Sequence, residues 1–370
     1  MIPASHDTHF YRCIFTDGDE YSIDLLDLCR KAKALTFDVR YLKPKFVSSP
    51  LETPFHEIRI AFPDEHYHGN PILKAQEPFT GNYDVFISAL RSALINYLMT
   101  LDVDQKYLML HSSGMDSRFI SGTMAEMRRA KLRSFKNIHF RCHEPECADF
   151  IRIMQAEGWP ETQYSCWQHD PLDYYDIGRE DICVQGWCSY TNQMNFWSDI
   201  ISDPKEWIVI TGEGGELFKY ISVYPHDPPK YSENYMLNML IDHNPAKGEW
   251  ENQFALYWKD AIMPLWSFQY LAVSNRVHKD WVKGDKKTGW DNIRRDLVKS
   301  VGLDFIEYKE PNYKWGISQQ RKDEMLNLFY NGRFVRNYGH MLPKKIDFFS
   351  NPSGWESALW GFAVTLYDKI

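Results

Sequence analysis

The stretch "YLMLHSSGMDSRFI", residues 107–120, places four largely apolar residues directly before a small, polar turn that contains a glycine. The apolar run predicts a short buried strand, and the apolar spacing after the turn predicts a helix from about Asp116. Backbone N–H groups of such a turn and of a helix start attract anions. Either the turn therefore holds a phosphate, or Ser113 or Asp116 simply caps the helix.

Strand and helix patterns alternate on both sides of this turn. An amphipathic helix precedes it, and further apolar runs bounded by turns follow it. The predicted elements are a helix over 83–100, a strand over 137–142, a helix over 145–159, and strands over 162–166 and 206–210. This alternation predicts an α/β fold with a doubly wound parallel sheet, which binds ligands at the carboxyl ends of its strands.

The two ends of the chain follow different patterns. Residues 1–75 contain one predicted helix within 22–35 and a possible hairpin around 56–62, and we interpret them as an N-terminal extension. Residues 76–240 form the predicted α/β core. Residues 241–370 change to longer apolar segments, which predict a helical C-terminal part. The aromatic residues after 325 suit a cover over a substrate pocket or a partner surface.

Composition excludes several classes of protein. The net charge of -8 argues against a surface for nucleic acid, which needs a basic patch. The longest apolar window, interrupted by Pro264, is shorter than the ~20 residues of a membrane span, and the first residues lack a signal-peptide pattern. We therefore expect a cytoplasmic protein with no membrane partner. The seven cysteines lack zinc-site spacing and are expected to be reduced and structural.

A second glycine turn follows another predicted strand. "TGEGGELF", residues 211–218, supplies Gly212, Gly214 and Gly215 together with the carboxylates of Glu213 and Glu216. Mg²⁺ favours one or two carboxylates together with phosphate oxygens, so Asp116 and Glu216 are candidate ligands of one magnesium-bound nucleotide. Alternatively, this is an ordinary turn that exposes solvated glutamates.

The two turns resemble the sequence motifs of a known family. "SSGMDSR" is similar to the S-G-G-x-D-S pyrophosphate loop of the N-type ATP pyrophosphatases, also called adenine nucleotide alpha hydrolases. "TGEGGELF" resembles the G-E-G-x-D-E-[LI]-F loop of their asparagine synthetase branch. "KKTGWDNIRRDLV" (286–298) and "NYKWGI" (312–317) resemble that branch's K-x-x-x-L-R helix and R-x-K-x-G-F motif. The resemblance covers roughly residues 76–320 and implies ATP and Mg²⁺ as cofactors.

The resemblance implies a role for individual residues. The predicted nucleotide-binding residues are Ser112, Ser113, Gly114, Met115, Asp116, Ser117, Gly212, Gly214 and Gly215. Asp116 and Glu216 would hold the metal. Glu213 matches a glutamate beside the reaction centre, where it would handle the proton of an incoming amine. Lys314 matches a lysine that stabilises charge in the transition state, which is usually a large catalytic contribution.

The sequence also departs from the family pattern. Ser113 replaces a glycine, which requires a negative φ at this position. The single Glu216 stands for an Asp-Glu pair, and Asn312 stands where the third motif has arginine. A glutaminase nucleophile would be a cysteine at residue 2, where this chain has Ile2. The N-terminal extension resembles the connector that follows the glutaminase domain. We therefore expect nitrogen to come from ammonia, an amine or a separate donor protein.

These features predict an AMP-forming amide ligase that adenylates a small carboxylate and transfers the acyl group to ammonia or an amine. Two alternatives remain open. One is a nucleotide-binding protein that keeps the fold but has lost turnover, which the altered motifs favour. The other is a nucleoside- or tRNA-modifying enzyme of the same superfamily, which the acidic charge disfavours because such enzymes need a basic surface.

Overall fold

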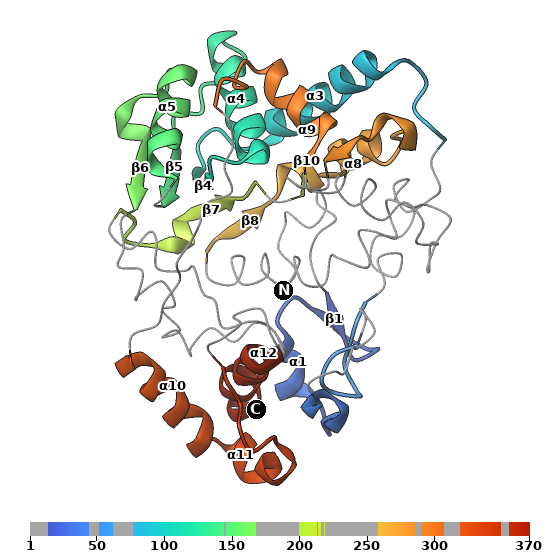
Figure 1. Ribbon diagram of the computed structural model, residues 1–370, viewed down its shortest axis with the longest axis vertical. Helices are drawn as coiled ribbons and strands as arrows, with labels where there is room; N and C mark the ends of the chain where they lie inside the picture. The colour runs from blue at the N-terminus through green and yellow to red at the C-terminus, as the bar shows by residue number, and fades with distance from the viewer. Residues whose placement is uncertain are drawn as a thin grey trace.

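A computed structural model shows a parallel sheet covered by helices at one end of the molecule and a smaller assembly of helices and short strands at the other (Figure 1). The structure describes residues 14–43, 52–61, 77–143, 146–167, 200–212, 214–215, 218, 258–285, 290–306, 319–348 and 355–370. In this described part of the chain, no helix combines the length and the apolar character that crossing a membrane requires.

Five parallel strands form the main sheet, as the alternating pattern predicts. They are β4 (Lys106–Leu110), β5 (Ile138–His143), β6 (Tyr164–Trp167), β7 (Trp207–Ile210) and β8 (Asp260–Ile262). Their order is β6-β5-β4-β7-β8, and every neighbouring pair is parallel. The chain thus adds β5 and β6 on one side of β4 and then β7 and β8 on its other side. The order reverses between β4 and β7, which is where sheets of this kind bind ligands.

The strand β8 corrects one prediction. We interpreted residues 241–370 as helical, but residues 260–262 add a fifth strand beside β7. This strand is only three residues long and is buried throughout, so it shows neither the alternation nor the length that identifies a strand in a sequence. The predicted helices are present further on, as α8 (Phe268–Ser274) and α9 (Asn292–Ser300).

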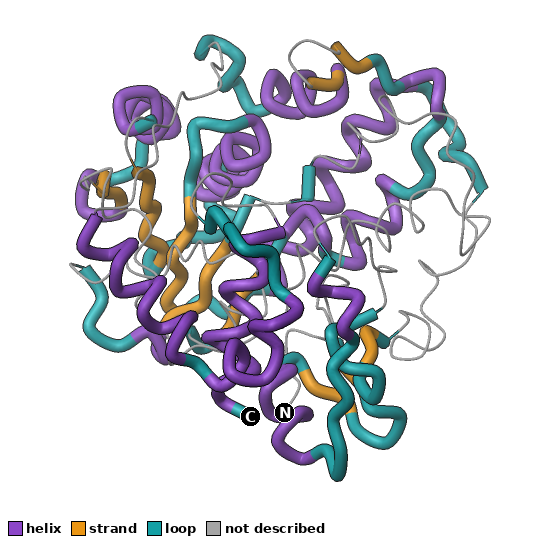
Figure 2. Tube along the Cα trace, turned by 60° about the horizontal axis from the view of Figure 1, so that its bottom comes forward, coloured by secondary structure: helices purple, strands orange, loops and turns teal. Residues whose placement is uncertain are grey.

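The two faces of the sheet contribute to different hydrophobic cores. Along β4, Tyr107 and Met109 belong to the large core, whereas Leu108 packs on the opposite face with Val209 and Trp258. The large core also takes in the apolar sides of α3 (Tyr83–Thr100), α4 (Met115–Arg129), α5 (Cys147–Glu157), α8 and α9. The described helices of the α/β part therefore pack on one face of the sheet. Figure 2 shows the helices in purple and the strands in orange. Helices on both faces, which the doubly wound class implies, stay a prediction.

A separate core joins the two ends of the described chain. It contains Phe15, Leu28 and Phe37 from the N-terminal side and Phe334 and Phe362 from the C-terminal side. Its N-terminal elements are β1 (Phe15–Thr16), β2 (Tyr21–Ser22), α1 (Leu25–Lys31) and β3 (Arg59–Ile60), and its C-terminal helices are α10 (Gln319–Asn331), α11 (Arg333–Tyr338) and α12 (Trp355–Gly361). The division of the chain at 75/76 and 240/241 stays a prediction. The two cores group the segments of the chain in a different way from this division.

The predicted hairpin around 56–62 is only partly present. The strand β3 pairs with β1 rather than with a neighbour in sequence, and the sheet order is β2-β1-β3. A single antiparallel bridge, between Glu52 and Arg59, is all that the described residues show of a local hairpin. The pairing with β1 is long-range, and local turn residues do not reveal it.

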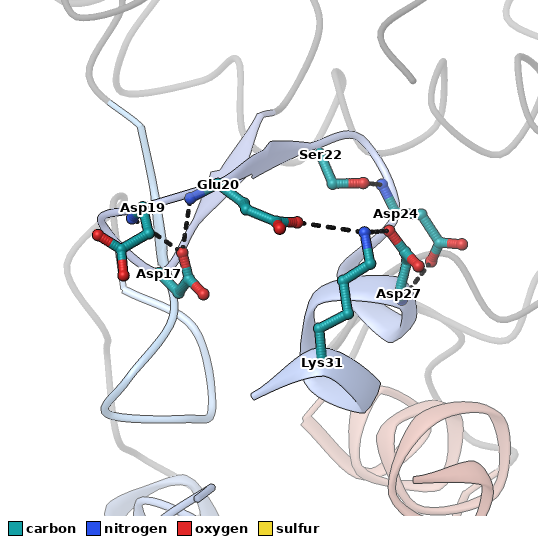
Figure 3. A network of polar contacts seen from close by, with 7 residues as sticks. All are labelled: Asp17, Asp19, Glu20, Ser22, Asp24, Asp27 and Lys31. Atoms are coloured by element: carbon teal, nitrogen blue, oxygen red, sulfur yellow. Dashed lines mark hydrogen bonds and ion pairs between the residues drawn. The ribbon is translucent and has the colours of Figure 1, made fainter. Parts of the chain in front are cut away.

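Polar contacts cap the start of α1 and hold the helix against the β1–β2 turn (Figure 3). The Asp24 carboxylate caps the helix by accepting hydrogen bonds from the N–H groups of Leu26 and Asp27. Lys31 forms ion pairs with Glu20 at 3.2 Å and with Asp27 at 2.9 Å, so it ties the helix to the turn. The Asp27–Lys31 pair has the favourable order for a helix, with the acidic residue one turn before the basic one.

Candidate functional site

The two glycine turns follow adjacent strands and meet at the reversal point of the sheet. The strands β4 and β7 are paired, with Met109 opposite Ile210 at their carboxyl ends. The turn after β4 begins at His111 and the turn after β7 begins at Thr211. Two turns that are about a hundred residues apart in sequence are thereby brought into contact, as the strand pattern predicts.

The first turn runs into α4 without any side-chain cap. Gly114 is the N-cap residue of α4 and makes no capping hydrogen bond through a side chain. The alternative that Ser113 or Asp116 caps this helix is therefore wrong. The Ser112 hydroxyl instead accepts a hydrogen bond from the Gly114 N–H at 3.2 Å, and it lies 3.3 Å from the Ser117 hydroxyl. The hydroxyl groups of the turn therefore fix its shape, and the turn lies beside the start of a helix. This arrangement suits an anion.

Ser113 fits the position where the resembling family has glycine. In the described part of the chain, the only residues other than glycine with a positive φ are Lys131 and Phe135, so Ser113 has the negative φ that this substitution requires. Its side chain is buried, and its hydroxyl donates to the Glu146 carboxylate at 3.4 Å. The replacement is therefore accommodated without backbone strain.

The second turn packs so closely that only glycine fits it. A side chain at Gly215 would place its first carbon 1.8 Å from Asp116 Oδ1, and one at Gly212 would place it 2.6 Å from Ser117 Oγ. Gly214 has a φ of 104° and faces the Trp266 ring, which would lie 1.8 Å from an added carbon. The glycines thus bring the backbone of this turn directly against the start of α4.

Asp116 is held from its other side by an arginine of α9. Arg294 Nη1 lies 3.5 Å from Asp116 Oδ2, and Arg294 Nε donates to Asp291 Oδ2 at 2.7 Å. Burial alone would lower the pKa of Arg294, but the charges of Asp116 and Asp291 outweigh burial and raise the pKa. Tyr270 is fully buried beside this group, and its pKa is raised well above the usual value, mainly by burial. Asp116 therefore already has a cationic neighbour.

A buried polar network lies behind the first turn, and the sequence did not reveal it. His111 Nε2 lies 3.0 Å from the Ser121 hydroxyl, which donates to Glu157 Oε1 at 2.6 Å. Trp159 Nε1 donates to the other oxygen of Glu157 at 2.6 Å. Burial raises the pKa of Glu157 to about 8 and lowers the pKa of His111 to about 3. At neutral pH, both side chains are therefore uncharged.

Arg118 fixes the carbonyl side of the first turn. This arginine is almost fully buried, with Nε donating to the Ser113 carbonyl at 2.6 Å and Nη1 donating to the Ile306 carbonyl at 2.6 Å. It therefore connects the turn to the chain that leads away from α9. A charged residue that interrupts the apolar face of a predicted helix is the signal by which sequence reasoning would have found it.

The structure brings some of the predicted site residues together and does not describe others. Asp116 and Ser117 of the first turn lie against Gly215 and Gly212 of the second, respectively, and Gly114 is the N-cap residue of α4. Met115 is buried in the large core, so it contributes backbone rather than a side chain to the site. Glu213, Glu216 and Lys314 lie outside the described residues.

The donors present fit a magnesium ion that arrives together with a polyphosphate. Asp116 is a partly exposed carboxylate beside a turn whose backbone would be displaced by any side chain. Within the described ranges, no group of three or more His, Cys, Asp or Glu side chains is arranged to hold a metal. One carboxylate completed by phosphate oxygens and water is a common way of binding Mg²⁺. The four described cysteines, Cys29, Cys142, Cys147 and Cys166, form no disulfide.

Comparison with known proteins gives no further assignment. No protein-family model matches this chain, and no curated protein matches it significantly.

Proposed function

We propose that this protein is an ATP-dependent, AMP-forming amide ligase with the adenine nucleotide alpha hydrolase fold. The observation that carries the proposal is the contact between Asp116 and Gly215, which joins two glycine turns at the reversal point of a parallel sheet. Such a position is where doubly wound sheets bind nucleotides, and the start of α4 adds favourable electrostatics for phosphate. The sequence motifs are the reason for proposing a ligase among the activities that this fold can carry.

In the proposed reaction, a substrate carboxylate attacks the α-phosphorus of ATP, and pyrophosphate leaves. Ammonia or an amine then attacks the acyl-adenylate, which gives an amide and AMP. Ser112, Gly114 and Ser117 would bind the pyrophosphate, and Asp116, with Glu216, would hold Mg²⁺, which supplies charge neutralisation. Glu213 would accept the proton of the amine, and Lys314 would stabilise charge in the transition state. Much of the catalysis would be positioning.

A nucleotide-binding protein without turnover is the second candidate. The contact between Arg294 and Asp116 favours it, because a guanidinium already neutralises the carboxylate that would hold the metal. This candidate shares the nucleotide site with the first and differs only in chemistry.

The experiment that separates the two candidates is a pyrophosphate-release assay with ATP, Mg²⁺ and a panel of carboxylic acids, with and without amines. The variants are Asp116→Asn, which keeps the shape of the side chain, and Lys314→Ala, with the exposed Lys299→Ala as the matched control. The ligase requires acid-dependent release that Asp116→Asn and Lys314→Ala abolish and Lys299→Ala preserves. ATP binding without release for any acid identifies the second candidate, and absence of ATP binding rejects both.

A further inference from the structure

Three charged side chains form a fixed row beside the candidate site. Asp291, whose side chain is fully buried, caps α9 by accepting the Arg294 backbone N–H at 2.9 Å, and it also accepts Arg294 Nε. The Arg294 side chain is only 11% exposed, and its Nη1 lies near Asp116 Oδ2. Because Asp291 is itself anchored in the helix start, the guanidinium has little freedom to leave Asp116.

This row has a consequence for a bare metal ion. A divalent cation bound to Asp116 would lie within a few bond lengths of the guanidinium, and both are positive. In a partly buried site such repulsion is screened far less than in water. The Asp291 carboxylate keeps its negative charge and offsets this repulsion only in part, because the guanidinium lies between it and Asp116.

A metal–polyphosphate complex has the opposite sign of net charge. Magnesium with a triphosphate or with pyrophosphate is anionic, so the guanidinium attracts it. A guanidinium also carries five N–H donors in a planar arrangement, which suits phosphate oxygens.

We propose that Arg294 makes this site selective for a metal–polyphosphate complex over the free metal ion. It is a positioning residue that repels a bare divalent cation from Asp116 and attracts the cation once phosphate accompanies it. This inference rests on the proposed nucleotide site, but not on the ligase reaction.

The test measures binding rather than turnover. Free Mn²⁺ binding is followed by electron paramagnetic resonance, and binding of Mg²⁺–ATP and Mg²⁺–pyrophosphate is followed by calorimetry. The variants are Arg294→Met, Arg294→Lys and the double variant Asp291→Asn/Arg294→Met. The double variant removes one charge of each sign, keeps the net charge, and retains a good helix-capping residue. Thermal unfolding of each variant confirms that it is folded.

We expect Arg294→Met and the double variant to bind free Mn²⁺ about tenfold more tightly than the unaltered protein, and Mg²⁺–ATP about tenfold less tightly. Arg294→Lys keeps the charge and should resemble the unaltered protein for free Mn²⁺. If the variants do not fold, the unaltered protein alone still tests the idea, because it should bind Mn²⁺–pyrophosphate at least about tenfold more tightly than free Mn²⁺.

Unchanged Mn²⁺ binding in folded Arg294→Met and in the folded double variant would overturn the inference, as would a preference of the unaltered protein for the free ion. Binding of Mg²⁺–ATP with the expected Arg294 pattern, but without pyrophosphate release, rejects the ligase and supports this inference. An unaltered protein that binds neither complex overturns both proposals.

Discussion

The Oδ1 atom of Asp116 occupies the space that the first side-chain carbon of any residue other than glycine would need at position 215. The aspartate lies in the first turn of the helix after one strand, and the glycine belongs to the turn after the adjacent strand. The carboxylate and the backbone of the second turn are therefore in direct contact.

Gly215→Ala should weaken Mg²⁺–ATP binding by about tenfold or more, because the added methyl group must displace either the Asp116 carboxylate or the turn. Calorimetry measures the binding. The control is Gly18→Ala, where an added carbon meets no atom within 4 Å but the φ of 99° strains the backbone. This control should lower stability by about 1 kcal/mol and leave nucleotide binding unchanged. Equal binding in Gly215→Ala and the unaltered protein would show that the contact is irrelevant to the ligand.

Arg118→Met should lower the free energy of unfolding by about 3 kcal/mol, because the buried carbonyls of Ser113 and Ile306 lose their donor. It should also weaken nucleotide binding, since the Ser113 turn is no longer fixed. Urea unfolding measures the first effect and calorimetry the second. Arg129→Met, at an exposed position of the same helix, should change stability by less than about 1 kcal/mol. Comparable losses in the two variants would refute the bracing role of Arg118.

Glu157→Gln should alter how stability depends on pH. The pKa of Glu157 is about 8 in the folded protein and about 4.5 in the unfolded chain, so the protonated carboxyl stabilises the fold fully below pH 4.5 and this stabilisation is lost as pH rises to about 8. Over this window the unaltered protein should lose about 1.4 kcal/mol per pH unit relative to Glu157→Gln, which cannot ionise. Urea unfolding at several pH values checks this slope. His111 titrates in both proteins and cancels from the difference.

A pH-independent difference between the unaltered protein and Glu157→Gln would mean that Glu157 is ionised in the folded state. The exposed Glu161→Gln is the matched control for replacing a glutamate by glutamine at the surface.

Phe37→Ala should destabilise the core that joins the two ends of the chain. The Phe37 ring stacks on Phe362 with centroids 5.1 Å apart and meets the edge of Phe334 at 5.7 Å. Loss of this ring should cost about 3–4 kcal/mol. Hydrogen exchange of α10 and α11 should increase, while Mg²⁺–ATP binding is retained. The half-exposed Val39→Ala is the control, with a cost below about 1 kcal/mol. Loss of nucleotide binding in Phe37→Ala would show that the two cores are not independent.

Much of the α/β part follows from the sequence, because each of its units is local. The helix over 83–100 and the strands ending at Leu110 and Ile210 show clear periodicity, and turn residues mark their ends. The contact between the two glycine turns also follows, since carboxyl ends of neighbouring parallel strands share one edge of the sheet. The match between predicted and observed helix over 83–100 is complete.

What the sequence could not reveal depends on partners far apart in the chain. Arg294 contacts Asp116 and Arg118 contacts Ile306, and no local pattern specifies either pair. The buried Glu157 looks like an ordinary polar residue at the end of a helix, because its burial depends on Ser121 and Trp159 folding over it. The packing of the aromatic C-terminal residues against the N-terminal residues could not be predicted, because contacts between rings produce no recognisable spacing in the sequence.

The pairing of Phe37 with Phe362 also sets an order of events during synthesis on the ribosome. Among the described residues, the core of the main sheet and its covering helices contains none after Ile306, so this part is able to assemble as the chain emerges. The N-terminal residues of the second core are made before the main sheet, yet their aromatic partners are translated after it. Until those partners are made, Phe15, Leu28 and Phe37 lack the part of their core that the C-terminal helices supply, and these apolar residues stay exposed on the newly made chain.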